Sequence, residues 1–330
     1  MRLLLAESID EAHLPKLKYP VLVSRKEDGM RVTIYKGQAV TRRVEPLGND
    51  FTRKWLELNI PEGMEGELTL RSGNPLQDVT SAFSSQAGRP DFVFNVFEWR
   101  IPLQTSFEER LRRIFTWYLD RSQGILAANR PGLTDPWHKL LLKCGEPQPQ
   151  AKSTAPARIR IIPSFWHGDS EEVLAFYRTV LEDKGEGIVI RAPDGPYKFG
   201  RSTKKEGYFL KLVPLHECEV DVIGWKESMT NTNKATVDKR GYTKRSSAKS
   251  GKVGKGVLGS LHCMLASGAQ FHVSGFDDKT RVELFKIRHQ LPGMRATIRY
   301  KVLTAAGKPR EPVFVAFRTD LPTNRKRKTS

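Results

Sequence analysis

Residues 21–31, Val-Leu-Val-Ser-Arg-Lys-Glu-Asp-Gly-Met-Arg, contain the pattern around which we expect the chain to fold. The apolar residues 21–23 are typical of a short buried strand, and Asp28-Gly29 is a strong signal for a hairpin turn. A second strand is expected over residues 31–35, where polar and apolar side chains alternate. Lys26 then lies where the first strand ends, just before the turn. Taken alone, this motif also fits a surface hairpin with a solvated lysine.

The composition is that of a globular protein without covalent cross-links. A chain of 330 residues suggests about two domains. The three cysteines are widely spaced and odd in number, which argues against a disulfide framework or a cysteine zinc site. The apolar start spans only residues 3–6, too few for a signal peptide, and no run is long enough to cross a membrane. We therefore expect a cytoplasmic protein.

The charge is strongly positive and unevenly distributed. The formal net charge is +18. Residues 215–330 contain 23 Lys and Arg against 10 Asp and Glu, whereas residues 1–214 contain 32 against 27. A basic C-terminal third predicts a polyanionic partner, and nucleic acid is the one we expect. An anionic membrane is disfavoured, because the sequence shows no basic amphipathic helix.

Residues 1–214 show a mixture of strand and helix patterns. Strands are expected over residues 21–24, 31–35, 38–41, 66–70, 91–100, 159–163, 187–191 and 207–213, and helices over 51–59, 106–119 and 170–183. Ser106 and Glu109 have the spacing of a capping box at the start of the second helix. Residues 144–158 are rich in Pro, Gln and Ala, which is typical of an exposed loop.

After residue 214 the pattern is dominated by strands. We expect them over residues 219–225, 256–265, 270–274, 295–302 and 313–317, with one helix over 280–289. Five strands and one helix in this length are typical of a small OB-type barrel. The fold class expected is α+β, with one domain over residues 1–214 and a barrel over 215–330.

Seven short elements follow one another along the chain. They are Lys26-Glu-Asp-Gly29 with Arg31, Thr41-Arg42, Glu65-Gly-Glu-Leu68, Phe94 in Val93-Phe-Asn-Val96, Glu186-Gly-Ile-Val-Ile-Arg191, Lys211 in Tyr208-Phe-Leu-Lys-Leu-Val213, and Phe317-Arg-Thr-Asp320. Each alone fits an ordinary core or surface residue. Their order resembles the motifs of the ATP-dependent DNA ligases, RNA ligases and mRNA capping enzymes. That resemblance implies a nucleotidyltransferase domain with ATP-grasp-like antiparallel sheets and helices, followed by an OB-fold barrel.

The resemblance also assigns roles to individual residues. Lys26 would attack the α-phosphate of ATP, forming AMP-lysine and releasing pyrophosphate. ATP is thus the expected cosubstrate, with Mg²⁺ or Mn²⁺ held by Glu67 and Glu186. The residues expected to bind ATP are Ser24, Arg25, Arg31, Arg42, Glu67, Phe94, Lys211 and Arg318. Among these, Phe94 would stack on adenine and Arg318 would reach the β- and γ-phosphates.

One motif departs from the family pattern. The last nucleotidyltransferase motif usually has a second lysine two residues after the first, and Val213 occupies that position here. Lys198, Lys204 or Lys205 is a candidate for the missing cation. In addition, Glu65 and Asn95 stand where aspartates are common in the family.

A basic segment interrupts the barrel pattern over residues 226–256. It is polar, contains glycines, and holds nine Lys or Arg against two acidic residues. We interpret it as a phosphate-tracking loop that folds on duplex DNA, although a solvated disordered loop is the alternative. Its candidate DNA-binding residues are Lys234, Lys239, Arg240, Lys244, Arg245, Lys249, Lys252 and Lys255. Residues 324–330 resemble a disordered basic tail.

The sequence thus predicts a small two-domain ATP-dependent DNA ligase of the kind that bacteriophages encode. It would seal nicks between a 3′-hydroxyl and a 5′-phosphate in duplex DNA during replication, repair and recombination, as a monomer in the cytoplasm of a bacterium or infected host. An RNA ligase is the alternative enzyme, and a capping enzyme is disfavoured because Leu321 follows Asp320 where that family has lysine. A non-catalytic, OB-type nucleic-acid-binding protein is the alternative from another class.

Overall fold

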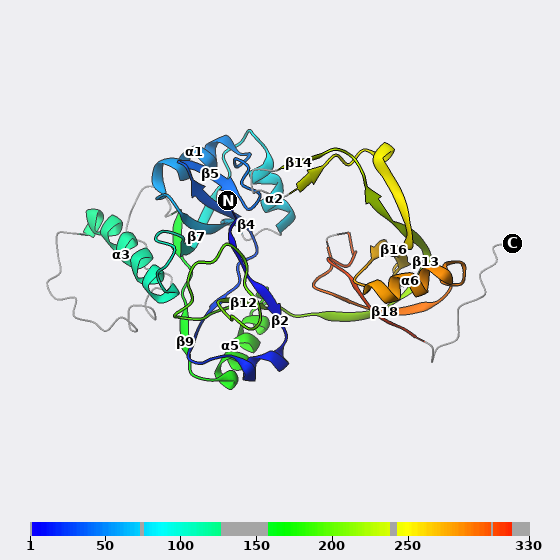
Figure 1. Cartoon of the computed structure of the whole chain (residues 1–330). Coiled ribbons are helices and arrows are strands. Elements are labelled where there is room, and N and C mark those ends of the chain that lie inside the picture. Colours follow the sequence, from blue (N-terminus) through cyan, green and yellow to red (C-terminus); the bar gives the residue numbers. More distant parts are fainter. Residues whose placement is uncertain (1, 73–75, 127–157, 238–242, 305, 319–330) are drawn as a thin grey trace. The chain divides into compact units, whose positions relative to one another are not determined.

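The computed structural model describes residues 2–72, 76–126, 158–237, 243–304 and 306–318. These residues form two compact units, the first ending at Val213 and the second beginning at Pro214 (Figure 1). The loop expected over residues 144–158 lies outside the described residues except for Arg158, as does the expected tail over 324–330.

The first unit is built on two five-stranded sheets. The first sheet has the order β2 (Glu7–Ile9), β12 (Phe209–Leu212), β10 (Ile188–Arg191), β3 (Val21–Arg25) and β9 (Phe165–His167). The second has the order β5 (Gln38–Thr41), β4 (Met30–Tyr35), β6 (Met64–Leu70), β7 (Phe92–Trp99) and β8 (Ile159–Ile161). β1 (Leu4–Leu5) pairs separately with β11 (Gly200–Arg201). Most strand pairs in the two sheets are antiparallel, as expected, while β1–β11, β2–β12 and β7–β8 are parallel pairs.

Helices cover the apolar faces of these sheets. α1 (Asp50–Asn59), α2 (Leu76–Ser84) and α3 (Phe107–Leu126) contribute to one core with the apolar side chains of the second sheet. η1 (Glu11–Lys16) and α5 (Ser170–Glu182) pack on one face of the first sheet, as Figure 1 shows for α5. Strand alternation then leaves the opposite face of the first sheet, which includes Ser24 and Lys211, directed away from α5.

The prediction of a hairpin between β3 and β4 at Asp28-Gly29 is wrong. β3 pairs with β9 and β10 in the first sheet, whereas β4 pairs with β5 and β6 in the second. Residues 26–29 therefore cross from one sheet to the other instead of reversing between neighbouring strands. A Cβ atom on Gly29 would lie 2.3 Å from the carbonyl oxygen of Leu68, so only glycine fits where the crossing passes β6.

The second unit is a five-stranded barrel. Its sheet has the order β17 (Gln270–Val273), β16 (Lys252–Met264), β13 (His216–Asn231), β18 (Arg295–Tyr300) and β19 (Val313–Phe317). A bridge between Ser274 and Val313 joins the two ends of this order. α6 (Asp278–Lys286) and η3 (Arg288–Gln290) follow β17, and Leu284 of α6 enters the barrel core. The expected five strands and single α-helix are therefore present in this part of the described chain.

The segment expected as a loop over residues 226–256 is largely extended strand. β13 and β16 continue well beyond the barrel as the arms of a long hairpin. Between them lie the short pair β14 (Ala235–Val237) and β15 (Thr243–Arg245), followed by η2 (Lys249–Gly251). Figure 1 shows these arms extending away from the barrel. Across the described residues, no helix is long and apolar enough to span a membrane.

Candidate active site

Lys26 and Glu186 form the centre of the candidate site. The Nζ atom of Lys26 makes an ion pair with the carboxylate of Glu186, and the two side chains remain 24% and 30% exposed. The backbone N–H of Lys26 also donates to the carbonyl of Gly187 at 2.9 Å. An amine that is held by a carboxylate and still reachable from solvent is suited to meet a ligand.

The backbone around Glu186 explains how this pair forms. α5 ends at Glu182, and Lys184 and Gly187 then adopt positive φ angles of 58° and 139°. A Cβ atom on Gly187 would lie 2.4 Å from the carbonyl oxygen of Leu212, so the chain passes very close to β12 at this point. The turn thereby places Glu186 beside the end of β3, where Lys26 begins the crossing to the second sheet.

A second carboxylate, Glu67, lies near this pair. Glu67 is opposite Arg31 on β4 and opposite Asn95 on β7, so the three side chains share one face of the second sheet. Desolvation raises the pKa of Glu67 to about 7, while the positive charges of Lys26 and Arg31 oppose that rise and Glu186 adds to it. The side chain is therefore poised to change its protonation state near neutral pH.

Arg31 is fixed from behind by a buried acid. Its Nε atom donates to Oε2 of Glu65 at 3.1 Å, and its Nη2 atom donates to the same oxygen. Glu65 is fully buried, and its other oxygen accepts a hydrogen bond from the hydroxyl of Tyr197. The Arg31 guanidinium also lies 5.1 Å from the centroid of the Phe97 ring. These contacts leave Arg31 oriented beside Glu67.

Phe94 does not face this site. It is fully buried, it lies opposite Leu68 in the row that enters the core, and a Cβ atom on Gly66 would lie 2.6 Å from its ring. The ring of Phe94 is buried in this structure, and its stacking on adenine stays a prediction. Sequence reasoning missed Phe97, which contacts Arg31. Strand alternation was the signal that could have found it, because it separates Phe94 from Asn95 and Phe97.

The other expected ATP-binding residues of the first unit lie at different depths. Ser24 is buried and lies in one row with Val189 and Lys211 across the first sheet. The side chain of Arg25 points to the other face, where Nη1 lies 3.2 Å from a carboxylate oxygen of Asp183. Arg42 is exposed in the turn after β5.

The structure does not single out one residue that replaces the second lysine of the last motif. Val213 lies against Gly187, because a Cβ atom there would be 3.1 Å from the Val213 side chain. The Nζ atom of Lys198 donates hydrogen bonds to both carboxylate oxygens of Glu206, at 2.7 and 2.6 Å. Lys204 and Lys205 are exposed. The three lysines stay candidates.

Arg318 belongs to the second unit. It follows β19 and forms an ion pair with Glu219 of β13, which also lies 3.6 Å from Arg295. Thr319 and Asp320 of the same motif lie outside the described residues.

The basic hairpin presents its charges to solvent. Lys234, Lys244, Arg245, Lys249, Lys252 and Lys255 are all exposed, while Lys239 and Arg240 lie outside the described residues. Asn233 ties the hairpin together, since its amide donates to the carbonyls of Ser246 at 3.1 Å and Ala248 at 3.0 Å. Asn231 donates to Ser246 at 2.7 Å, and the Thr232 N–H donates to Gly251 at 2.7 Å. We call residues 231–233 the hairpin clamp.

The residues near Lys26 fit a divalent cation that is shared with a nucleotide. Among the described residues, no three His, Cys, Asp or Glu side chains cluster as a protein-only metal site. Mg²⁺ commonly takes one or two carboxylates together with phosphate oxygens and water. Glu67 and Glu186 supply two such carboxylates. They lie close enough for the charge of Glu186 to raise the pKa of Glu67.

The fold and the site define the class: a two-sheet unit with a lysine-centred site, followed by a five-stranded barrel of the OB type. Residues 250–318 match the family model of the DNA ligase OB-like domain. Two structures of Chlorella virus DNA ligase-adenylate are 23% identical to this chain, with TM-scores of 0.51 and 0.52, and cover 96% of it and 98–99% of their own length. A structure from a study of Lig E DNA ligases is 21% identical, with a TM-score of 0.62, and covers 96% of this chain and 99% of its own. The chain has the fold of these DNA ligases. No curated protein matches its sequence significantly.

Proposed function

We propose that this protein is an ATP-dependent DNA ligase. One observation carries the proposal: the Lys26–Glu186 pair, with Glu67 and Arg31 beside it, lies in a unit that has the fold of DNA ligases. Lys26 would attack the α-phosphate of ATP and release pyrophosphate, leaving AMP on its Nζ atom. AMP would then pass to the 5′-phosphate of a nick, and the 3′-hydroxyl would displace it. Residues 1–214 would carry the adenylylation and residues 215–330 the DNA contacts.

The residues around Lys26 supply binding and orientation. Arg31 offers a guanidinium edge to phosphate or ribose oxygens, for which its planar geometry is suited. Glu67 would accept a hydrogen bond from a ribose hydroxyl. Phe97 offers a ring next to Arg31 on which adenine could stack. Mg²⁺ or Mn²⁺ held by Glu67 and Glu186 would offset phosphate charge and favour the neutral amine of Lys26.

The DNA partner is proposed to be nicked duplex. Six exposed basic residues of the hairpin face solvent, and phosphate contacts of this type provide affinity without reading sequence. Deletion of residues 230–252 should weaken binding to a nicked duplex while self-adenylylation continues. Unchanged nick affinity in the deletion would contradict this assignment. We propose a monomer acting in the cytoplasm in replication, repair and recombination.

The decisive experiment compares sealing of a labelled nick in DNA–DNA duplexes with sealing in RNA-containing duplexes, at equal enzyme and ATP. A DNA ligase should seal the DNA–DNA nick much faster than a nick between RNA strands. Preferential sealing of RNA ends would support the RNA ligase alternative. Nick binding without any sealing or AMP transfer would support a non-catalytic binding protein.

A further inference from the structure

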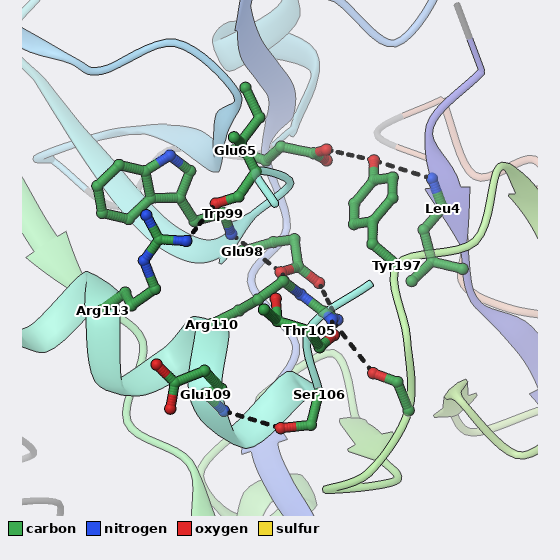
Figure 2. A network of polar contacts seen from close by, with 12 residues as sticks. Leu4, Glu65, Glu98, Trp99, Thr105, Ser106, Glu109, Arg110, Arg113 and Tyr197 are labelled. Atoms are coloured by element: carbon green, nitrogen blue, oxygen red, sulfur yellow. Dashed lines mark hydrogen bonds and ion pairs between the residues drawn. The ribbon is translucent and has the colours of Figure 1, made fainter. Parts of the chain in front are cut away.

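Tyr197 lies behind the candidate site, between β6 of the second sheet and the short strand β1. Its hydroxyl donates to Oε1 of Glu65 on β6 and accepts the backbone N–H of Leu4 at 3.1 Å (Figure 2). The ring is 4% exposed. The hydroxyl therefore uses one donor and one acceptor position, and both are directed at groups that have little access to water.

Glu65 divides its two oxygens between Tyr197 and Arg31. Oε1 accepts from the tyrosine hydroxyl, and Oε2 accepts from both Nε and Nη2 of Arg31. Glu65 thus links Tyr197 directly to the arginine that stands beside Glu67. These bonds use the Nε and Nη2 atoms of Arg31 and fix the orientation of its guanidinium plane.

The protonation states support this direction of bonding. Burial raises the pKa of Tyr197, and the negative charge of Glu65 raises it further, so the hydroxyl keeps its proton. Burial alone would lower the pKa of Arg31, but the charge and the hydrogen bond of Glu65 raise it above its ordinary value. A neutral hydroxyl and a charged guanidinium are therefore maintained on either side of the Glu65 carboxylate.

The segment that carries Tyr197 is itself tightly held. Arg110 of α3 binds Glu98 through Nε at 2.7 Å and through Nη2 at 3.3 Å, while its Nη1 atom donates to the carbonyl of Gly195 at 3.2 Å (Figure 2). The N–H of Tyr197 donates to the carbonyl of Leu103 at 3.1 Å. The position of Tyr197 is consequently well defined, so its hydroxyl can orient the side chain of Glu65.

A glutamate at position 65 needs such a fixed point. Glutamate has one more rotatable side-chain bond than the aspartate that is common at this position in the resembling families, so its carboxylate can occupy more positions. The hydroxyl of Tyr197 selects the one that orients Arg31 beside Glu67.

We propose that Tyr197 is a positioning residue for transfer of AMP to Lys26, acting through Glu65 on the guanidinium of Arg31. This inference rests on the proposed function. Tyr197 would touch neither ATP nor Lys26. Its hydroxyl fixes the carboxylate, the carboxylate fixes the guanidinium, and the guanidinium holds the nucleotide in the geometry for attack. A small displacement of such a group is enough to reduce a rate strongly.

The test uses the full chain with Tyr197→Phe, which removes only the hydroxyl, and Tyr19→Phe as the matched control. Tyr19 also donates its hydroxyl, to the carbonyl of Leu14 at 3.0 Å, a group outside this network. Formation of the AMP adduct is followed as a function of ATP concentration, well below the melting temperature. At saturating ATP we expect the Tyr197→Phe rate to fall about tenfold and the Tyr19→Phe rate to stay within twofold.

A double mutant separates positioning from general loosening of the fold. In an Arg31→Lys background there is no planar guanidinium for Glu65 to orient, so Tyr197→Phe should lower the rate by less than twofold. A full tenfold loss in that background would show that Tyr197 acts independently of Arg31 and would overturn the inference. If Tyr197→Phe does not fold, Glu65→Gln tests the same link, and a rate equal to that of wild type would overturn it.

The same assay distinguishes this inference from the proposed function. A wild-type protein that forms no AMP adduct would overturn both. A wild-type protein that forms the adduct, together with an unchanged rate in folded Tyr197→Phe, would overturn the positioning role alone.

Discussion

The ammonium of Lys26 forms an ion pair with Glu186, a residue 160 positions further along the chain. Two backbone features create this proximity: the crossing of residues 26–29 between sheets, and the turn at Gly187, whose carbonyl accepts the Lys26 N–H. The pair is thus a product of the fold and not of the local hairpin that Asp28-Gly29 suggests.

Glu186→Gln should lower the rate of AMP transfer to Lys26 by about two orders of magnitude, as removal of one preorganised electrostatic group typically does. The fold should persist, because Glu186 is partly exposed. Stopped incubations with labelled ATP measure the rate. Glu182→Gln, an exposed position at the end of α5, is the matched control and should behave as wild type. Equal rates in both variants would argue against a role for Glu186.

Glu67 should make adenylylation depend on pH around neutrality. Desolvation raises its pKa to about 7, and the ionised form is the one that can bind a cation or accept a hydroxyl donor. The rate should therefore rise as the pH increases from 6 to 8. A profile that is flat over this interval, at constant ionic strength and saturating ATP, would contradict the assignment.

The same shift predicts a stability effect with a definite sign. Because the folded-state pKa of Glu67 is higher than the unfolded value of 4.5, its contribution to stability is fully present below about pH 4.5 and is lost as the pH rises through about 7. Glu67→Gln mimics the protonated form, so its melting temperature relative to wild type should increase from pH 5 to pH 8. Calorimetry at both pH values measures this, and a difference that is independent of pH would refute it.

Phe94 and Phe97 should respond oppositely to truncation. Phe94→Ala removes a fully buried ring and should lower the free energy of unfolding by about 3–5 kcal/mol. Phe97→Ala should affect stability much less, but it should raise the ATP concentration needed for half-maximal adenylylation, because the ring lies beside Arg31. Denaturant titrations and ATP titrations on both variants are the measurements. A nucleotide-binding defect confined to Phe94→Ala would reverse this assignment.

The hairpin clamp should matter for DNA and not for ATP. Asn233→Ala removes the amide that joins residue 233 to Ser246 and Ala248, so the exposed lysines lose their common framework. We expect weaker binding to a nicked duplex, with self-adenylylation within twofold of wild type. Asn59→Ala, which removes an amide in α1, serves as control. Fluorescence anisotropy at several salt concentrations measures the binding.

Several parts of the fold could be predicted because local patterns decide them. Ser106 accepts the N–H of Glu109 at 3.2 Å at the start of α3, as its spacing indicated (Figure 2). Asp169 caps α5 by accepting the N–H groups of Glu171 and Glu172, both at 2.9 Å. The strands of the barrel also follow their alternation. α3, however, extends to Leu126 instead of ending near residue 119.

Other parts depend on contacts that a single sequence does not display. Asp28-Gly29 has the composition of a turn, but pairing of β3 with β10 and of β4 with β6 determines the path between them. The basic segment has the composition of a loop, yet the Asn231 and Asn233 amides and the pairing of β13 with β16 organise it. Tyr197 was missed because its partner Glu65 is 132 residues away.

The central claim is that Lys26 carries AMP. The most direct measurement is mass spectrometry of peptides from the protein after incubation with ATP and Mg²⁺, with Lys26→Ala and Lys18→Ala treated in parallel. Lys18 is highly exposed and is a lysine control outside the site. We expect an added AMP on the peptide containing Lys26 in wild type and in Lys18→Ala, and no adduct in Lys26→Ala. An adduct that persists in Lys26→Ala, or that maps to another residue, would contradict it.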